Sequence, residues 1–386
     1  MITGIKKSLL KFIQIESSSS LVLAIATILA MVLANSGFSH SYFDVLNRHF
    51  FHLSISHWIN DGLMTVFFFL VGLEIKREMS VGELNSLKKA SFPVAAAFGG
   101  MIVPAIIYFL FNSNPPNSQG WGIPMATDIA FALGVLTVFG RRIPVALKIL
   151  LLAVAIVDDL GAIIVIALFY TAKINWLGFA ICVVAVLGVQ FFKHLRIYSY
   201  WAYLFLGIVL WIGVLYSGVH ATIAGVVLGL LTPINFVGTG RNKIEPVAYL
   251  IDVLHYPVGL LIMPIFALAN AGVVINVSSL STAISTDIFK GIFFGLVLGK
   301  PIGIMFFSLM SCKIKVSTLP VGLNWKHIFG LGNLAGIGFT MSLFISKLAL
   351  IKELEQIAKL SVLVTSLVAL IIGVISIRFF CLVEKD

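Results

Sequence analysis

Long apolar runs, interrupted by short polar connections, make up most of the chain. A helix needs about 20 apolar residues to cross the hydrocarbon core of a bilayer, and many of these runs approach that length. The runs that we predict to span are 20–35, 58–75, 91–111, 121–139, 145–170, 176–192, 199–216, 219–234, 248–270, 288–310, 327–346 and 357–379. The pattern therefore predicts an all-α polytopic membrane protein with about 12 transmembrane helices.

Composition and the distribution of charge support this prediction and orient the chain. Hydrophobic residues make up 60% of the chain and charged residues 11%, against about 25% charged residues in soluble domains. Most of the 26 lysines and arginines fall in alternate connections, beginning with the N-terminal segment. Because cytoplasmic loops are enriched in basic residues, we expect both termini in the cytoplasm. The net charge of +10 is dispersed over these loops, so we expect no nucleic-acid partner.

Two parts of the chain resemble each other at a fixed offset, which matches Pro93 with Pro301 and Phe131 with Phe339. The offset aligns spans 3–5 with spans 10–12. Because the third and tenth spans cross in opposite directions, the two copies form an inverted-topology repeat, an arrangement whose ligand sites lie near the bilayer midplane. The fourth and eleventh spans contain the glycine-rich segments GWGIPMATDIAFALGVL and FGLGNLAGIGFTMSL. We expect both to be discontinuous helices, with unwound backbone that is buried or lines a cavity.

Charged residues interrupt two of the predicted spans far from either end. Asp158 and Asp159 lie in the fifth span, and Lys300 lies in the tenth. A central aspartate costs about 2.5–3.5 kcal/mol on insertion scales, so a retained pair indicates function, and Lys300 is a natural partner for one carboxylate. Burial favours the neutral form of a carboxylate, so a proton and a hard cation can compete for it. Thr127 and Asp128 lie at the break of the fourth span, where they can bind an ion or neutralise helix ends.

Polar residues near the ends of spans leave two interpretations open. Each is either an ordinary solvated helix end or part of a site that responds to pH. The candidates are Asp61, Glu74, Glu78, His220, Asp252 and His255. The three cysteines are far apart and form neither a disulfide framework nor a metal motif. We expect no cofactor.

Several motifs strongly resemble those of the NhaA family of bacterial sodium/proton antiporters. They are FFFLVGLEIKRE, GWGIPMATDIAFALGVL, LKILLLAVAIVDDLGAIIVIALFYT, GVHATIAGV, FALANAGV and GKPIGI, and the resemblance runs from about Glu16 to Phe379. It implies that residues 1–386 form a single transmembrane transporter domain of the bacterial cell inner membrane, and not an enzyme. It also implies electrogenic, pH-regulated exchange of cytoplasmic Na⁺ and Li⁺ for external H⁺. The family forms homodimers, partly through a periplasmic loop like residues 37–57.

The resemblance also implies a role for each candidate residue. Asp159 would be the principal aspartate of the Na⁺ site, with Asp158 beside it as a second Na⁺-binding residue and the partner of Lys300. Thr127 and Asp128 would lie where the broken fourth and eleventh helices cross. The cytoplasmic-funnel and pH-response residues would be Glu74, Glu78, His220 and Asp252. The last of these stands one position away from the acidic residue of the family, so the pH profile is not carried over.

Other classes of membrane protein fit these residues less well. An intramembrane aspartyl protease needs a GxGD motif, and the nearest segment, GLGN at 330–333, lacks the acid. A prenyl transferase needs two aspartate-rich magnesium motifs, whereas this chain has a single aspartate pair. A channel is expected to present rings of like charge or filter carbonyls from symmetric subunits. Another kind of secondary transporter stays open as an alternative, and so, less strongly, does a passive channel.

Overall fold

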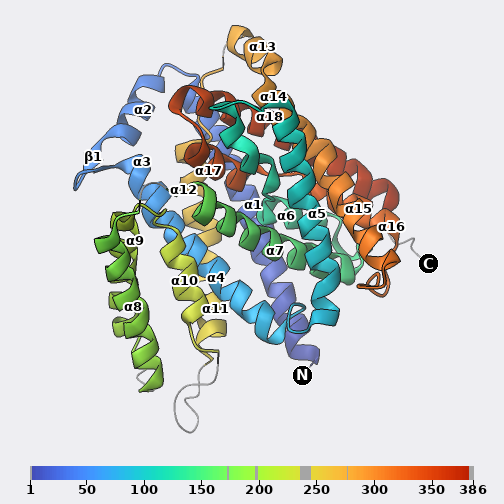
Figure 1. Ribbon diagram of the computed structural model, residues 1–386. Helices are drawn as coiled ribbons and strands as arrows, with labels where there is room; N and C mark the ends of the chain where they lie inside the picture. The colour runs from blue at the N-terminus through green and yellow to red at the C-terminus, as the bar shows by residue number, and fades with distance from the viewer. Residues whose placement is uncertain (1, 172–173, 196–198, 235–244, 276, 382–386) are drawn as a thin grey trace. The chain divides into compact units, whose positions relative to one another are not determined.

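The computed structural model describes residues 2–171, 174–195, 199–234, 245–275 and 277–381. These residues are helical almost throughout (Figure 1). Within the same ranges the only strands are β1 (His49–Phe50) and β2 (Leu53–Ser54), which pair antiparallel with His49 opposite Ser54. The chain forms two compact units, and one long helix, α7 (Val145–Phe169), contributes to both.

The first unit comprises Met1–Asp44, Ser86–Ala162 and Ala267–Asp386. Its helices are α1 (Ile2–Ala34), part of α2 (Ser39–Asn47), α5 (Leu87–Phe111), α6 (Ile129–Val138), the start of α7, the second half of α12 (Met263–Asn270), α13 (Val277–Ser285), α14 (Asp287–Phe294), α15 (Lys300–Lys313), α16 (Trp325–Ala335), α17 (Phe339–Ala349) and α18 (Lys352–Phe380). Its 3-10 segments are η2 (Asn117–Met125) and η3 (Gly140–Arg142), and its π-helical segment is η6 (Gly295–Gly299). Helix α5 packs along α15 (Figure 1).

The second unit comprises Val45–Asn85 and Ile163–Phe266. Besides the two strands, it contains α3 (Ile55–His57), the π-helical segment η1 (Trp58–Leu63), α4 (Met64–Val81), the end of α7, α8 (Trp176–His194), α9 (Tyr200–Ser217), α10 (Ile223–Leu231), α11 (Pro246–Pro257) and the π-helical segment η5 (Val258–Ile262). Helices α8 and α9 lie side by side (Figure 1), and α10 packs against α4.

Among the described residues, eight helices are long and apolar enough to cross a membrane, or up to ten if each of two bent pairs is one span. One bent pair joins Ser18–Ala34 to Ser39–Asn47, at 112°, and the other joins α16 to α17, at 48°. All twelve runs predicted from the sequence contain helix, but two are short. The apolar part of α9 is Trp201–Ser217, and α10 has only 9 residues. The fold is thus that of a helical, multi-pass membrane protein.

Glycines allow helices to approach closely in both units. In the first unit, a Cβ atom on Gly303 of α15 would lie 2.7 Å from the carbonyl carbon of Gly99 on α5. In the second unit, a Cβ atom on Gly225 of α10 would lie 2.8 Å from the amide nitrogen of Phe69 on α4. Small residues at such positions let backbones touch, which is the usual basis of helix association in lipid, where the hydrophobic effect does not drive packing.

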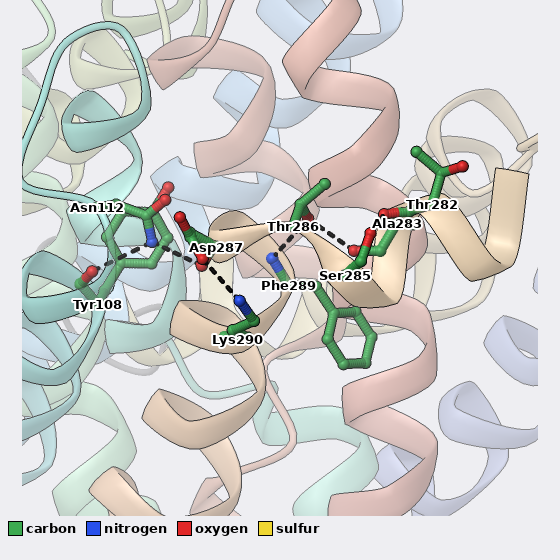
Figure 2. Close-up of polar contacts among 9 residues, drawn as sticks. All are labelled: Tyr108, Asn112, Thr282, Ala283, Ser285, Thr286, Asp287, Phe289 and Lys290. Carbon is green, nitrogen blue, oxygen red and sulfur yellow. Dashed lines mark hydrogen bonds and ion pairs between the residues drawn. The ribbon is translucent and has the colours of Figure 1, made fainter.

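Polar contacts join α5 to α14 at the end of α5 (Figure 2). The buried side chain of Asn112, which caps α5, donates hydrogen bonds to the carbonyl oxygens of Tyr108, at 3.2 Å, and Asp287, at 2.8 Å. Asp287 is the first residue of α14, and Thr286 caps that helix by accepting a hydrogen bond from the Phe289 amide. One amide side chain therefore satisfies a carbonyl on each of two helices that are distant in sequence.

Candidate functional site

Both helices that the sequence predicts to be discontinuous are interrupted. In the fourth predicted span, η2 ends at Met125 and α6 begins at Ile129, with Ala126 and Asp128 in extended conformation between them. In the eleventh, α16 ends at Ala335 and α17 begins four residues later. Each interruption leaves amides and carbonyls that the helix itself no longer bonds.

The two interruptions meet at one place in the first unit. The amide of Asp128 donates to the carbonyl of Ile337 at 2.6 Å. The Thr127 hydroxyl donates to the carbonyl of Ala335 at 2.9 Å. Close by, the rings of Phe131 and Phe339 pack edge to face with centroids 5.1 Å apart. The unwound segments are therefore each other's hydrogen-bonding partners.

Asp128 serves the free N-terminal ends of two helices. It is 1% exposed and caps α6, accepting from the amide of Phe131 at 3.2 Å. Its other carboxylate oxygen accepts from the amide of Thr340, at 3.1 Å, and from the Thr340 hydroxyl, at 2.5 Å. A negative charge here is favoured by the partial positive charge at the start of both α6 and α17.

Lys300 and Asp158 form a buried ion pair. Lys300 is 1% exposed, and its Nζ lies 2.5 Å from Asp158 Oδ2. The ammonium also donates to the carbonyl of Met125, the last residue of η2. Thr127 Oγ1 donates to the same Oδ2 atom at 2.7 Å. Directly before Lys300 the helix contains the π-helical turn η6, a feature that is common at functional sites.

The remaining oxygen of this carboxylate has no hydrogen-bond partner among the described residues. Asp158 Oδ1 is buried, and Asp159 is buried as well, at 2% exposure, within electrostatic range of Lys300. If all three groups are ionised, Asp158, Asp159 and Lys300 bring two negative formal charges and one positive formal charge into the interior. Leaving such a charge buried costs several kcal/mol, so a proton or a monovalent cation would be held there strongly.

Glu74 and His255 lie together in the second unit. The distance from Glu74 Oε1 to His255 Nδ1 is 3.8 Å, and His255 is 5% exposed. Asp252 is on the same helix as His255 but is exposed. The half-buried Glu78 accepts a hydrogen bond from the amide of Glu83, which follows the end of α4. The sequence analysis placed Asp252, and not His255, in the pH-response set, whereas the buried residue of this helix that lies beside Glu74 is His255.

His220 lies elsewhere in the second unit. Its Nε2 is 2.8 Å from the carbonyl of Tyr170, and it is within electrostatic range of Asp61. The indole of Trp211 donates to the Asp61 carbonyl at 2.9 Å. Asp61 and Glu74 are roughly 20 Å apart along their helix at 1.5 Å per residue, so His220 is not grouped with Glu74. The predicted topology already indicated that Asp61 and His220 lie on the same side of the membrane, because each begins a span that is predicted to run from outside toward the cytoplasm.

Comparison with known proteins identifies the family. The family model described as Na⁺/H⁺ antiporter 1 matches residues 10–377. This chain belongs to that family. A relative from Clostridium beijerinckii, "Na(+)/H(+) antiporter NhaA 1", is 47% identical over 382 residues, covering 96% of this chain and 94% of its own. A Vibrio cholerae relative, "Na(+)/H(+) antiporter NhaA", is 45% identical over 381 residues, covering 97% and 98%. The resemblance to NhaA proteins seen in the sequence is thus confirmed.

A solved structure has a similar fold. The sodium proton antiporter MjNhaP1 from Methanocaldococcus jannaschii superposes with a TM-score of 0.54 and 14% identity, covering 98% of this chain and 99% of that one. At this identity the likeness concerns the fold alone. It agrees with the apolar helices in describing a multi-pass membrane protein.

Sequence reasoning missed several groups at the crossing of the broken helices. Thr340 holds Asp128, and the carbonyls of Met125 and Ala335 accept from Lys300 and Thr127. The signal for Thr340 was its position just after the second glycine-rich break. Nothing in a sequence marks one backbone carbonyl among many.

Proposed function

We propose that this protein is a secondary active antiporter that exchanges cytoplasmic Na⁺, and also Li⁺, for external H⁺. One observation carries the assignment: among the described residues, the buried carboxylate oxygen Asp158 Oδ1 has no hydrogen-bond partner, and a second buried carboxylate, Asp159, is the next residue in the chain. A hard monovalent cation prefers such oxygen ligands, and a proton neutralises them equally well. Family membership supports Na⁺ and H⁺ as the two ions. The assignment includes neither an enzymatic reaction nor a cofactor.

Competition for the two carboxylates is the proposed means of exchange. Na⁺ would bind at Asp158 and Asp159, with the hydroxyl of Thr127 nearby, and its arrival would displace protons. Because two carboxylates can give up more than one proton for each monovalent cation, the cycle would move net charge and be electrogenic. Lys300 would hold Asp158 in place, and the Asp128 carboxylate would keep the two helix starts together in every state.

The regulatory residues are proposed to be Glu74, Glu78, His220 and Asp252. Histidine is the side chain that ordinarily changes charge between about pH 5 and 8, and a neighbouring carboxylate influences that change. Support comes from the contact between Glu74 and the buried His255, which places a histidine outside this set beside one of its carboxylates. His220, beside Asp61, would sense pH at the other end of α4.

We also propose twelve spans, arranged as an inverted repeat of spans 3–5 and 10–12. Thr127 bonds Ala335, a residue 208 positions away, and Phe131 packs against Phe339 at the same separation. Contacts between equivalent residues are expected where a pseudo-two-fold axis passes between two copies. Residues 1–386 would form a single transporter domain in a bacterial inner membrane, surrounded by lipid.

Orientation and dimerisation are part of the same proposal. Both termini would lie in the cytoplasm, and residues 37–57, which contain the β1–β2 pair, would lie outside and contact a second copy. Single cysteines at positions 50 and 385, probed with an impermeant thiol reagent on intact cells, test the orientation. We expect labelling at position 50 alone. Labelling at position 385 alone would show the opposite orientation in the membrane.

Calorimetry on purified protein tests the competition. If protons and Na⁺ share the carboxylates, the affinity for Na⁺ must fall as pH falls, because a protonated carboxylate is a poor ligand. We expect this dependence near neutral pH, since burial favours the protonated form. A Na⁺ affinity that stays constant between about pH 6 and 8.5 would separate the proton and cation paths and reject the shared site. Exchange measured in everted vesicles with Na⁺, Li⁺ and K⁺ establishes the selectivity.

A further inference from the structure

Asp158 Oδ2 is shared by two donors that also reach the ends of broken helices. Lys300 donates to this oxygen and to the carbonyl of Met125, the last residue of η2. Thr127 donates to it and to the carbonyl of Ala335, the last residue of α16. All of these side chains are buried. A single carboxylate oxygen is thus linked to the C-terminal ends of both interrupted helices.

The two donors differ in how many protons they have to give. An ammonium carries three N–H groups, so Lys300 serves its two acceptors at the same time. A hydroxyl carries one proton, and Thr127 Oγ1 lies 2.7 Å from Asp158 and 2.9 Å from the Ala335 carbonyl. Only one of these contacts can be a full hydrogen bond at any moment. An ionised carboxylate is the stronger acceptor, so it is the Ala335 carbonyl that lacks a full hydrogen bond.

The usual donor to the Ala335 carbonyl is engaged elsewhere. In an unbroken helix the amide four residues on, that of Phe339, would donate to it. Here the Phe339 amide donates to the hydroxyl of Ser366 on α18, at 3.1 Å. Among the described residues, the hydroxyl of Thr127 is therefore the donor on which the Ala335 carbonyl depends.

We propose that Thr127 is a positioning residue that transmits cation occupancy of Asp158 to the break between α16 and α17. A cation at the unpartnered Oδ1 offsets the carboxylate charge and weakens its hold on the Thr127 proton, which then turns to the Ala335 carbonyl. Lys300 on α15 shares the Asp158 oxygen with this hydroxyl, Asp159 on α7 is within electrostatic range of Lys300, and Asp128 is the next residue in the chain. This role rests on the proposed function, in which Asp158 and Asp159 hold the cation.

Hydrogen exchange of the full-length protein tests this role. Amides in residues 333–341 are followed by mass spectrometry at one fixed pH, with and without saturating Na⁺, while calorimetry reports Na⁺ binding. In the wild-type protein Na⁺ is expected to slow exchange by about fivefold, the effect of one neutral hydrogen bond. Thr127→Val, which keeps the shape but has no donor, should lose this protection even at Na⁺ concentrations that calorimetry shows to saturate the variant, whatever its affinity. Thr127→Ser should restore it.

Two further variants distinguish the specific role of the Thr127 hydroxyl from general effects of replacing a hydroxyl. Thr137→Val is the same change on α6, where the hydroxyl donates to its own helix at Leu133, and it should keep the protection. Ser366→Ala frees the Phe339 amide to donate to Ala335, so it should reduce the protection although Thr127 and both carboxylates are intact. This second variant gives the test even if Thr127→Val fails to fold.

Each contrary outcome has a distinct meaning. Thr127→Val that binds Na⁺ and keeps full protection would show that Thr127 transmits nothing. Thr127→Val that no longer binds Na⁺ at any concentration would make the hydroxyl an essential ligand, which also overturns a transmitting role. If wild-type protein binds Na⁺ without any change at 333–341, this inference fails while the proposed function stands. If wild-type protein does not bind Na⁺ at all, it is the proposed function that fails.

Discussion

The crossing in the first unit and the titratable pair of the second unit hold charge in different ways. At the crossing, Lys300 Nζ lies 2.5 Å from Asp158 and both side chains are almost completely buried. In the second unit, Glu74 lies 3.8 Å from His255 and its side chain keeps 14% of its exposure. Loss of either partner of a close, buried ion pair lowers the free energy of unfolding by a large amount. Loss of a partner from the longer, less enclosed pair is expected to change the energy less, which agrees with the regulatory role proposed for Glu74.

The largest expected effect is at the aspartate pair. Asp158→Asn and Asp159→Asn should each remove most Na⁺/H⁺ exchange, because an amide neither releases a proton nor attracts a cation by charge. Transport is measured as ΔpH dissipation in everted vesicles. Asp287→Asn, at an exposed ion pair on α14, is the matched control and should exchange normally. Exchange at the wild-type rate in Asp159→Asn would show that the proposed Na⁺ site at Asp158 and Asp159 is wrong.

Loss of Lys300 should come next in size. Lys300→Ala leaves Asp158 buried without its cation, and removal of one partner of a buried pair costs about 3–5 kcal/mol. Without the ammonium the carboxylate keeps its proton more tightly, so half-maximal activity should move to higher pH. Thermal unfolding and the pH profile of transport measure the two effects. Lys290→Ala, which breaks an exposed pair, should cost at most about 1 kcal/mol of stability. If Lys300→Ala and Lys290→Ala lost equal stability, burial would make no difference to the energy of these ion pairs.

A smaller effect is expected at Thr340, within the same crossing. Thr340→Val removes one donor from the buried Asp128, which should cost about 1–3 kcal/mol. The Thr340 amide and the Phe131 amide still bond the carboxylate, so the protein should fold. Thr340→Ser keeps the hydroxyl and should recover most of the stability in chemical denaturation. Equal stability of the Val and Ser variants would mean that the hydroxyl adds nothing.

The smallest effect is expected in the second unit. His255→Asn should shift the pH dependence of exchange while leaving the maximal rate within about threefold of wild type, because Glu74 and His255, 3.8 Å apart, lie beyond hydrogen-bonding distance and are not proposed to bind the cation. Rates in everted vesicles across a pH series measure both quantities. Complete loss of exchange in His255→Asn would place this pair in the transport path and remove the distinction between the two regions.

Charged residues in the interior of spans were the most readable part of the sequence. Asp158, Asp159 and Lys300 are conspicuous because burying each charge costs much free energy. Their residue types alone therefore identify them as candidate site residues. The broken helices were also readable, since glycine and Pro124 weaken a helix in a recognisable way. Membership of the antiporter family followed from the motifs around these same residues.

Contacts made by common groups were not readable. Thr340 is one of many threonines, and backbone carbonyls such as that of Ala335 leave no mark in the sequence. Which hydroxyl meets which carbonyl depends on packing across more than two hundred positions of chain, as the Thr127–Ala335 bond shows with a separation of 208 residues. Helix length was a further difficulty, because the apolar run 219–234 gives a helix of only 9 residues.

The contact of Gly99 with Gly303 limits how this protein can vary. Gly303 lies about one helical turn after Lys300, and any side chain there would meet the α5 backbone. A methyl group at this point would push α15 sideways and carry the ammonium with it. The reach of the lysine toward its aspartate therefore depends on the absence of a single carbon atom where α5 and α15 meet. Substitutions that look harmless by polarity can thus silence the exchanger by steric displacement alone.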